Sequence, residues 1–373
     1  MGKKSEFNQN KDRELRLKLY EIMTLLPRYT YDYLNEKAER NPNTALAYAR
    51  DLNTFFQYLK EFCPEAAEVP IKDIPMELIE NLAYQDINEY QNYLDVKHPE
   101  ICGSKEHSNG KHAIARKMCS LRGLYKFLCE HGYMSKNPTT GAVKQKIKLA
   151  EHEIVRMNKD EVNSYLNVIK DSSVKSVHQK KILQNMQKRD FAILNLLLFC
   201  GIRVSECVAL DLDDLNFEEN SILVVRKGLK EQFVYFNDEV AQVLKEYVEE
   251  ERPKYVPFTD EKALFLSTQK RRISVRTIQQ MVKKYSKEIV INKNLSPHKM
   301  RSTYGTALYN KTGDIRLVAD VLGHSDINTT AKYYAATEDE RRKQAPRTKN
   351  RRNAQAPRKV RANGMKIKEK HFT

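Results

Sequence analysis

Four side chains that can bind or protonate a phosphate stand in three short segments of the second half of the chain: Arg203 in GIRVSE, His298 and Arg301 in SPHKMR, and His324 in LGHS. His298 and Arg301 are three residues apart at the start of an expected helix, so both can reach a single oxyanion. Arg203 follows a nearly continuous apolar run, and a rigid buried helix there would hold a guanidinium fork in place for phosphate oxygens. Two arginines and two histidines without a paired carboxylate indicate stabilisation of a phosphorane, which is the chemistry of phosphoryl transfer.

A lysine and a tyrosine extend this set. Lys227 lies in the turn of an expected β-hairpin, and Tyr333 lies nine residues after His324. Each residue alone has an ordinary structural explanation: Lys227 as solvated surface, Tyr333 as core packing, and Arg203 as the cap of a helix C-terminus or the partner of Glu206. Nothing in these segments resembles a metal-binding carboxylate cluster or a GxxxxGK[ST] phosphate loop. We therefore expect neither a bound metal nor a cofactor.

Taken together, the six residues resemble the active site of the tyrosine recombinase (phage-integrase) family, in which Arg, Lys, His-x-x-Arg, His and Tyr follow one another in this order. The matching positions are Arg203, Lys227, His298, Arg301, His324 and Tyr333. Within the family, the blocks LLPRYTYDYL and KRDFAILNLLLFCGIR make the chain most similar to the Xer-type, XerS-like site-specific recombinases. The chain departs from the usual Arg-His-Thr-Phe in reading RSTY from Arg301, and from the usual GNKER in reading GLKEQ after Lys227.

The resemblance implies a reaction and a role for each residue. Tyr333 would attack a DNA phosphodiester and form a 3′-phosphotyrosine, with His298 assisting its deprotonation and Lys227 protonating the departing 5′-oxygen. The two arginines would neutralise the phosphate, and His324 would hydrogen-bond to it. Strand exchange through a Holliday junction would then need neither ATP nor a metal.

The resemblance also implies partners and leaves several functions to compare. The partners are double-stranded DNA, a homotetramer assembled on two DNA sites, and a DNA translocase or accessory protein that controls the reaction. Chromosome-dimer resolution and mobile-element integration, excision or inversion are all compatible with the sequence. So are two other functions: a type IB topoisomerase-like enzyme, and a non-catalytic DNA-binding regulator derived from a recombinase. The complete set of catalytic residue types argues against the regulator, and the separate helical domain described below argues against the topoisomerase.

Length and composition place these residues in a two-domain cytoplasmic protein. The chain has 373 residues, of which 40% are hydrophobic, enough for more than one core. It contains no apolar run near the roughly 20 residues that cross a bilayer. Its polar start, MGKKSEFNQNKDRELRLK, is unlike a secretory signal. The six cysteines form no CxxC pair, which favours reduced thiols and excludes zinc-finger and secreted classes.

The charge of the chain is concentrated at its C-terminal end. The formal net charge is +16, and residues 341–373 hold thirteen lysines and arginines against the single acid Glu369. The rest of the chain is therefore only weakly basic. We expect residues 346–373 to be a disordered tail that either grips phosphates without sequence preference or only improves solubility.

The first part of the chain has the pattern of a small helical domain over residues 30–135, after a charged segment at 1–29. Leu52, Phe55, Phe56 and Leu59 recur at the spacing of one helix face. Further helices are expected over Gln85–Leu94 and from Lys111 to His131. By resemblance this is the family's helical (SAM-like) core-binding domain. Four cations of its last helix are candidate DNA contacts, with an ordinary solvated face as the alternative: Lys111, Arg116, Lys117 and Arg122.

A linker at 136–156 is expected to lead into a catalytic domain over residues 157–345. This domain is predicted to be α-rich, with a small antiparallel sheet formed by Ser221–Val225, Phe233–Phe236 and a third strand at Ala263–Leu266. Its apolar run, Phe191–Cys200, predicts a buried central helix. The other expected helices are Val240–Glu250, Val275–Ile289, Pro297–Asn310 and Ile315–Leu322. The predicted fold class is thus mainly α, with one small sheet in the second domain.

Overall fold

The computed structural model describes residues 6–95, 110–143, 156–170, 186–226, 230–256, 262–288, 295–324 and 330. These residues belong to two compact units. The first comprises Met1–Val155, Ser205–Tyr235 and Val248–Val275, and the second comprises Arg156–Val204, Phe236–Tyr247 and Arg276–Thr373. None of the described helices is both long and apolar enough to cross a membrane.

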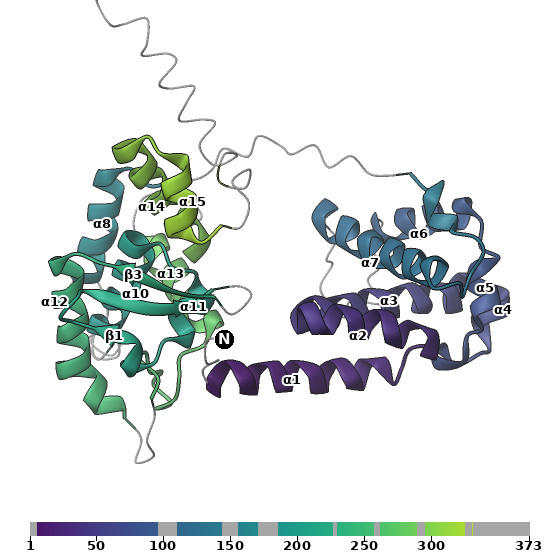
Figure 1. Ribbon diagram of the computed structural model, residues 1–373, viewed down its shortest axis with the longest axis horizontal. Helices are drawn as coiled ribbons and strands as arrows, with labels where there is room; N and C mark the ends of the chain where they lie inside the picture. The colour runs from purple at the N-terminus through teal and green to yellow at the C-terminus, as the bar shows by residue number, and fades with distance from the viewer. Residues whose placement is uncertain are drawn as a thin grey trace, which may run out of the picture. The chain divides into compact units, whose positions relative to one another are not determined.

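The N-terminal part of the first unit is a bundle of helices. Its helices are α1 (Glu6–Met23), α2 (Tyr31–Arg40), α3 (Pro42–Phe62), α4 (Pro64–Ala67), α5 (Met76–Glu80), α6 (Tyr84–Asp95) and α7 (Lys111–Glu130), with 3-10 turns at Arg28–Thr30, Ile71–Asp73 and Pro138–Thr140. Helix α3 is central, because it packs against α1, α2 and α7 (Figure 1).

Helix α3 follows directly from its sequence. Asn41 caps its first turn by accepting a hydrogen bond from the Thr44 amide, and Pro42 occupies the first helical position, where a missing N–H costs nothing. The predicted apolar stripe is confirmed: Leu52, Phe55, Phe56 and Leu59 are all at most 2% exposed. Burying large side chains at this spacing is what holds such a helix in a bundle.

Helix α1 is the element of this bundle that the sequence did not reveal. Its face toward α3 carries Leu19 and Met23, which are buried together with Leu26 just beyond the helix end. Between these positions the helix is rich in charge, so the apolar spacing is short and easily overlooked. Leu17 and Tyr20 remain exposed on another face of α1.

The sheet of the first unit has three antiparallel strands in the order β1 (Leu215–Asn216), β2 (Ser221–Val225) and β3 (Glu231–Tyr235). The register pairs Ile222 with Val234, and both side chains are buried, as a half-buried hairpin requires. The predicted β2 is confirmed. The third strand is β1 rather than Ala263–Leu266, whose ends form only isolated bridges to Asp211 and Arg272. A two-residue strand is too short to be recognised from alternation.

The remaining short elements of this unit are helix α11 (Val204–Ala209), which begins in the second unit, and 3-10 turns at Leu212–Asp214 and Arg252–Tyr255. Two arginines hold the loops here. Arg252 donates hydrogen bonds from Nε and Nη2 to the carbonyl oxygen of Ala263. Arg272 donates to the carbonyl oxygens of Val208 and Leu210 and pairs with Asp211. These bonds supply hydrogen-bond donors to carbonyl oxygens at the end of α11, directly after it, and in the Ala263–Leu266 segment.

The second unit is helical. It contains α8 (Lys159–Lys170), α10 (Gln187–Asn195), the π-helical turn Leu196–Cys200, α12 (Asp238–Glu246), almost all of α13 (Val275–Glu288), α14 (Pro297–Thr312) and α15 (Ile315–Leu322). A second π-helical turn, Tyr247–Glu251, follows α12 and passes into the first unit. Helix α10 packs against α8 and α12, the π-helical turn packs against α14, and α14 packs against α15.

The predicted buried central helix is confirmed, with one difference. Most side chains of α10 and of the π-helical turn are buried, but Phe199 is 38% exposed. The widening from an α-helix to a π-helix at Leu196 shifts the face that each following residue presents, and such widenings are frequent at functional sites. The turn ends at Gly201, immediately before Arg203.

The described cysteines are all free thiols. Cys200 and Cys207 are buried, and burial raises the pKa of the Cys200 thiol to about 12. Cys119 is exposed on α7, so not every cysteine is a core residue. Cys102 lies outside the described residues.

Candidate active site

Gly201 positions the first predicted arginine. Its backbone is left-handed, with φ of +60°, which ends the π-helical turn and reverses the chain. A side chain added there would force its neighbours to move, because a Cβ atom would lie 2.3 Å from Cδ1 of Tyr304 and 3.1 Å from Cδ2 of Leu322. Arg203 follows two residues later, half-buried, and donates a hydrogen bond from Nη2 to the Gly323 carbonyl oxygen at 3.1 Å.

Helix α14 positions the second arginine and the first histidine. Ser296 caps the helix by accepting a hydrogen bond from the Lys299 amide, and Pro297 is the first helical residue. His298 and Arg301 therefore lie one turn apart on the same face, as their spacing predicted. His298 is exposed, whereas Arg301 is only 3% exposed.

The two arginines are braced by backbone carbonyls at the ends of two helical segments. Arg301 donates from its two terminal nitrogens to the carbonyl oxygens of Gly201 and Leu322. Arg203 donates to the next carbonyl along, that of Gly323. Carbonyls at helix C-termini lack partners within the helix and carry partial negative charge, so guanidinium groups bind them well. Both cations are thus fixed in position before any phosphate binds.

The charge of these arginines acts on His298. Partial loss of hydration, and then the charges of Arg301 and Arg203, lower the pKa of the His298 imidazole. Protonation of His298 would place a third positive charge beside the permanent charges of Arg203 and Arg301. His298 is therefore neutral near pH 7 and can accept a proton.

His324 follows the end of α15, whose last turn is closed by a left-handed glycine. Gly323 has φ of +59°, and the His324 amide donates to the Ala319 carbonyl oxygen at 2.9 Å, as in a Schellman cap. The His324 Nδ1 atom lies 2.9 Å from Oγ1 of Thr330. Because Arg203 and Arg301 bind the carbonyls just before His324, the structure brings together Arg203, His298, Arg301 and His324 in the second unit.

Lys227 and Tyr333 lie outside the described residues. On either side of the three-residue gap 227–229, the Arg226 amide donates to the Lys230 carbonyl oxygen at 2.7 Å. The Arg226 side chain is buried and pairs with Glu206 at 2.8 Å. The sequence suggested Arg203 as an ordinary partner for Glu206 but gave no sign of this pair, because the two residues are twenty positions apart.

The four predicted DNA-contacting cations of α7 have different surroundings. Lys111 is exposed at the start of the helix. Arg116 and Lys117 both pair with the buried carboxylate of Asp51, at 2.5 and 3.3 Å, and the side chain of Arg116 remains 45% exposed. Arg122 is half-buried and donates to the Val143 carbonyl oxygen at 3.3 Å. Arg116 and Lys117 are thus held by α3 rather than being a simple solvated face.

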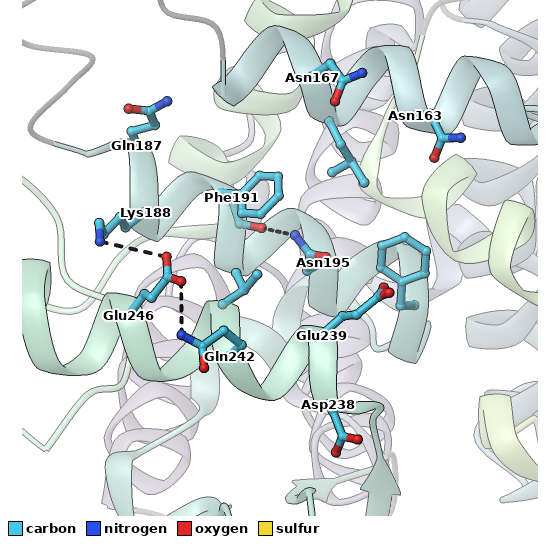
Figure 2. Close-up of a pocket in the computed structure, with 13 residues that line it drawn as sticks. Asn163, Asn167, Gln187, Lys188, Phe191, Asn195, Asp238, Glu239, Gln242 and Glu246 are labelled. Carbon is cyan, nitrogen blue, oxygen red and sulfur yellow. Dashed lines mark hydrogen bonds and ion pairs between the residues drawn. The ribbon is translucent and has the colours of Figure 1, made fainter.

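A separate cavity of about 1060 Å³ lies between α8, α10 and α12 in the second unit (Figure 2). Figure 2 shows Asn163 and Asn167 on one wall, with Glu239 and Glu246 on another. Glu246 accepts a hydrogen bond from Gln242 at 3.1 Å and also pairs with Lys188. The cavity lining contains none of the predicted catalytic residues.

Comparison with known proteins decides the family. The sequence model of the phage integrase family matches residues 155–341, which is half of the chain. The chain belongs to the phage integrase family.

Relatives of this integrase-family chain include two named Xer recombinases. Tyrosine recombinase XerC of Caldanaerobacter subterraneus subsp. tengcongensis is 35% identical over 311 residues, covering 81% of this chain and 80% of that protein. Tyrosine recombinase XerS of Streptococcus mutans serotype c is 30% identical over 352 residues, covering 88% of this chain and 98% of that protein. The expected resemblance to Xer-type recombinases is therefore confirmed.

Solved structures of the integrase family show the same fold. The Tn1549 transposon integrase in complex with transposon right end DNA has a TM-score of 0.59 and 21% identity, covering 86% of this chain and 99% of that chain. The XerH site-specific recombinase bound to palindromic difH substrate has a TM-score of 0.57 and 18% identity, covering 90% and 94%. The predicted mainly helical fold with one small antiparallel sheet is confirmed, and the enzyme is a site-specific tyrosine recombinase.

Proposed function

We propose that this integrase-family enzyme cuts and rejoins duplex DNA through a covalent bond to Tyr333, with Arg203, Lys227, His298, Arg301 and His324 as the other catalytic residues. The observation that carries the proposal is the pair of guanidinium groups braced by the carbonyls of Gly201, Leu322 and Gly323. Two fixed cations beside two imidazoles suit a phosphate whose negative charge grows in the transition state.

In the proposed cleavage step, the Tyr333 oxygen forms a bond to the scissile phosphorus as the bond from phosphorus to the 5′-oxygen breaks. The phenol proton moves to His298, which is neutral because its pKa is lowered. Lys227 gives a proton to the departing 5′-oxygen, leaving a 5′-hydroxyl. Arg203 and Arg301 neutralise the non-bridging oxygens, and His324 donates a hydrogen bond to one of them.

Rejoining is the same step in reverse with a different strand. The 5′-hydroxyl of a partner duplex attacks the phosphotyrosine, so the energy of the broken phosphodiester is retained and no nucleotide is consumed. We extend the proposal to a homotetramer that holds two DNA sites and passes through a Holliday junction. A DNA translocase or accessory protein acting on cytoplasmic chromosomal DNA completes the set of proposed partners.

The proposed domain organisation assigns DNA binding to both halves of the chain. Residues 30–135 form the core-binding domain, 136–156 the linker, 157–345 the catalytic domain, and 346–373 a basic tail. Lys111, with Arg116 and Lys117 held by Asp51, would contact the phosphate backbone from α7. The XerH and Tn1549 integrase structures contain DNA, which supports duplex DNA as the partner of this chain.

The proposal is tested by trapping the covalent intermediate. The enzyme is incubated with fragmented genomic DNA of its own organism, and DNA bound covalently to protein is recovered and sequenced. The recovered site is then made as a suicide duplex, nicked close to the cleavage position so that the strand cannot be rejoined. The wild-type enzyme should form a protein–DNA adduct that survives denaturation, and the recovered sequences should cluster at a chromosomal or mobile-element site.

Tyr333→Phe should bind the suicide duplex as tightly as the wild type and form no adduct, because the attacking oxygen is gone. Tyr334→Phe is the matched control and should react normally. Lys227→Ala should be slow on ordinary DNA and recover on a duplex whose bridging 5′-oxygen is replaced by sulfur, because a thiolate leaves without a proton. An adduct formed by the Tyr333→Phe variant would move the nucleophile to another residue and refute the assignment.

A further inference from the structure

Hydrogen bonds fix the backbone of His324, but they do not fix the orientation of its imidazole ring. The amide of His324 is held by the Ala319 carbonyl, and the preceding Gly323 carbonyl is held by Arg203. An imidazole in this place can still turn about its side-chain bonds and can carry its single proton on either nitrogen when neutral. The ring can donate a hydrogen bond to a phosphate only if its orientation and the position of its proton are both suitable.

Thr330 contacts the ring. Its hydroxyl oxygen lies 2.9 Å from Nδ1 of His324, and Thr330 is 0% exposed. A buried hydroxyl keeps a hydrogen-bond partner, because water is not there to replace it. The contact is therefore protected from solvent on the threonine side.

We propose that Thr330 is a positioning residue: its hydroxyl donates to Nδ1 of His324, orients the ring, and keeps the ring proton on Nε2. The inference rests on the proposed function for the role of His324, but the contact itself does not. Nδ1 and Nε2 are both bonded to Cε1 and direct their hydrogen bonds outward at diverging angles, so a ring held at Nδ1 by Thr330 points Nε2 toward a different partner. A proton on Nε2 makes that nitrogen a hydrogen-bond donor to a phosphate oxygen.

The choice of tautomer matters whenever the ring is neutral. A neutral imidazole has one N–H, and the hydrogen bond made by one nitrogen decides which nitrogen carries it.

Thr330 is tested with two substitutions and a matched control. Thr330→Val keeps the shape of the side chain and removes the hydroxyl, whereas Thr330→Ser keeps the hydroxyl. Thr306→Val removes another threonine hydroxyl of the same unit, which donates to the Ser302 carbonyl at 2.9 Å and touches no histidine ring in the described contacts. All variants are first compared with the wild type by thermal denaturation.

The direct readout is the position of the ring proton. The full chain is labelled with 15N-histidine, and the His324 signals are assigned by their loss in His324→Gln. In the wild type above pH 7, we expect the nitrogen shifts of a ring protonated at Nε2. Thr330→Val should shift them toward a mixture of tautomers, and Thr330→Ser and Thr306→Val should not. A wild-type ring protonated at Nδ1 overturns the proposal, even if Thr330→Val fails to fold.

The second readout is single-turnover cleavage of the suicide duplex. Thr330→Val should slow cleavage about tenfold, the lower end of the loss found when a residue that orients a metal-bound histidine is removed. Thr330→Ser should restore cleavage to within about threefold of the wild type. Equal rates for Thr330→Val and the wild type overturn the proposal. If the wild type forms no adduct at all, the proposed function fails, while the nitrogen spectra still decide whether Thr330 sets the tautomer.

Discussion

Replacing Gly201 by alanine tests how tightly the site is built. Gly201 combines a left-handed backbone, with φ of +60°, and a position where a Cβ atom would overlap Tyr304. Its carbonyl oxygen is also one of the two that accept from Arg301. The substitution should therefore destabilise the fold and at the same time displace the side chain of Arg301, one of the proposed catalytic residues.

The size of the stability loss follows from two separate terms. An L-residue in the left-handed region costs about 1–2 kcal/mol. The added methyl group would lie 2.3 Å from Cδ1 and 2.9 Å from Cε1 of the Tyr304 ring, which must move. Such overpacking costs about 1–3 kcal/mol, so Gly201→Ala should lower the free energy of unfolding by about 2–5 kcal/mol.

Two controls separate these terms. Gly132 also has a left-handed backbone, with φ of +72°, but a Cβ atom there would meet nothing within 4 Å. Gly132→Ala should therefore cost only the backbone term, about 1–2 kcal/mol. In a Tyr304→Ala background, the cost of Gly201→Ala should fall toward this value, because the overlapping ring is gone and only the Leu322 methyl group, 3.1 Å away, must shift slightly.

The assay is urea denaturation of each variant, followed by single-turnover cleavage under conditions in which the variant is folded. Gly201→Ala should cleave at least about tenfold more slowly than Gly132→Ala, because only the first moves a carbonyl that holds Arg301. If Gly201→Ala is no less stable than Gly132→Ala, Tyr304 does not pack against Gly201 and the reasoning is refuted. If it is unstable but cleaves normally when folded, the brace on Arg301 is not needed for catalysis.

Two further predictions concern charged groups. Glu206 and Arg226 form a buried pair with side chains only 5% exposed, so Glu206→Gln or Arg226→Met alone should cost about 3–5 kcal/mol in urea denaturation. Changing both should cost clearly less than the two losses combined, and simple additivity would show that the pair is not coupled. The pKa of His298 is lowered from the ordinary histidine value of about 6.5. The acid limb of the pH–rate profile for cleavage should therefore lie below about pH 6.5. The stability that neutral His298 contributes is present above about pH 6.5 and is lost as the pH falls through the lowered folded-state pKa. A pH–rate profile with its acid limb above that value, or one unchanged in His298→Gln, would contradict the role assigned to His298.

Short elements with strong local signals were predictable from the sequence. The expected helix Ile315–Leu322 is observed with those bounds, because Asp314 caps its start and Gly323 ends it in a left-handed conformation. Strand β2 is likewise observed at Ser221–Val225. Both depend on residues close in sequence, whose spacing is visible without a structure.

Elements that depend on distant contacts were not predictable. Helix α1 is stabilised by packing on α3, and its apolar residues are too sparse to stand out among its charges. Strand β1 has two residues, and its pairing with β2 is fixed by the turn at Asn216, whose side chain accepts from the amides of Glu218 and Glu219. Neither feature produces a periodic pattern of apolar residues in the sequence.

The residue types of the candidate site could be read from the sequence, but not what holds them. The motifs suggested Arg203 and Arg301 as phosphate ligands, and the structure adds that carbonyls from two helical ends brace them. The sequence did not single out Thr330, because side chains six residues apart touch each other in neither a helix nor a strand. Contacts of this kind arise only once the chain has folded.

The most direct test of the proposed active site is the identity of the residue that becomes linked to DNA. The adduct formed on the suicide duplex is digested with a protease and a nuclease, and the peptide that retains a nucleotide is sequenced by mass spectrometry. We predict a phosphodiester on Tyr333. Attachment to Tyr334 or to any other side chain would contradict the assembly of Arg203, His298, Arg301 and His324 around that nucleophile.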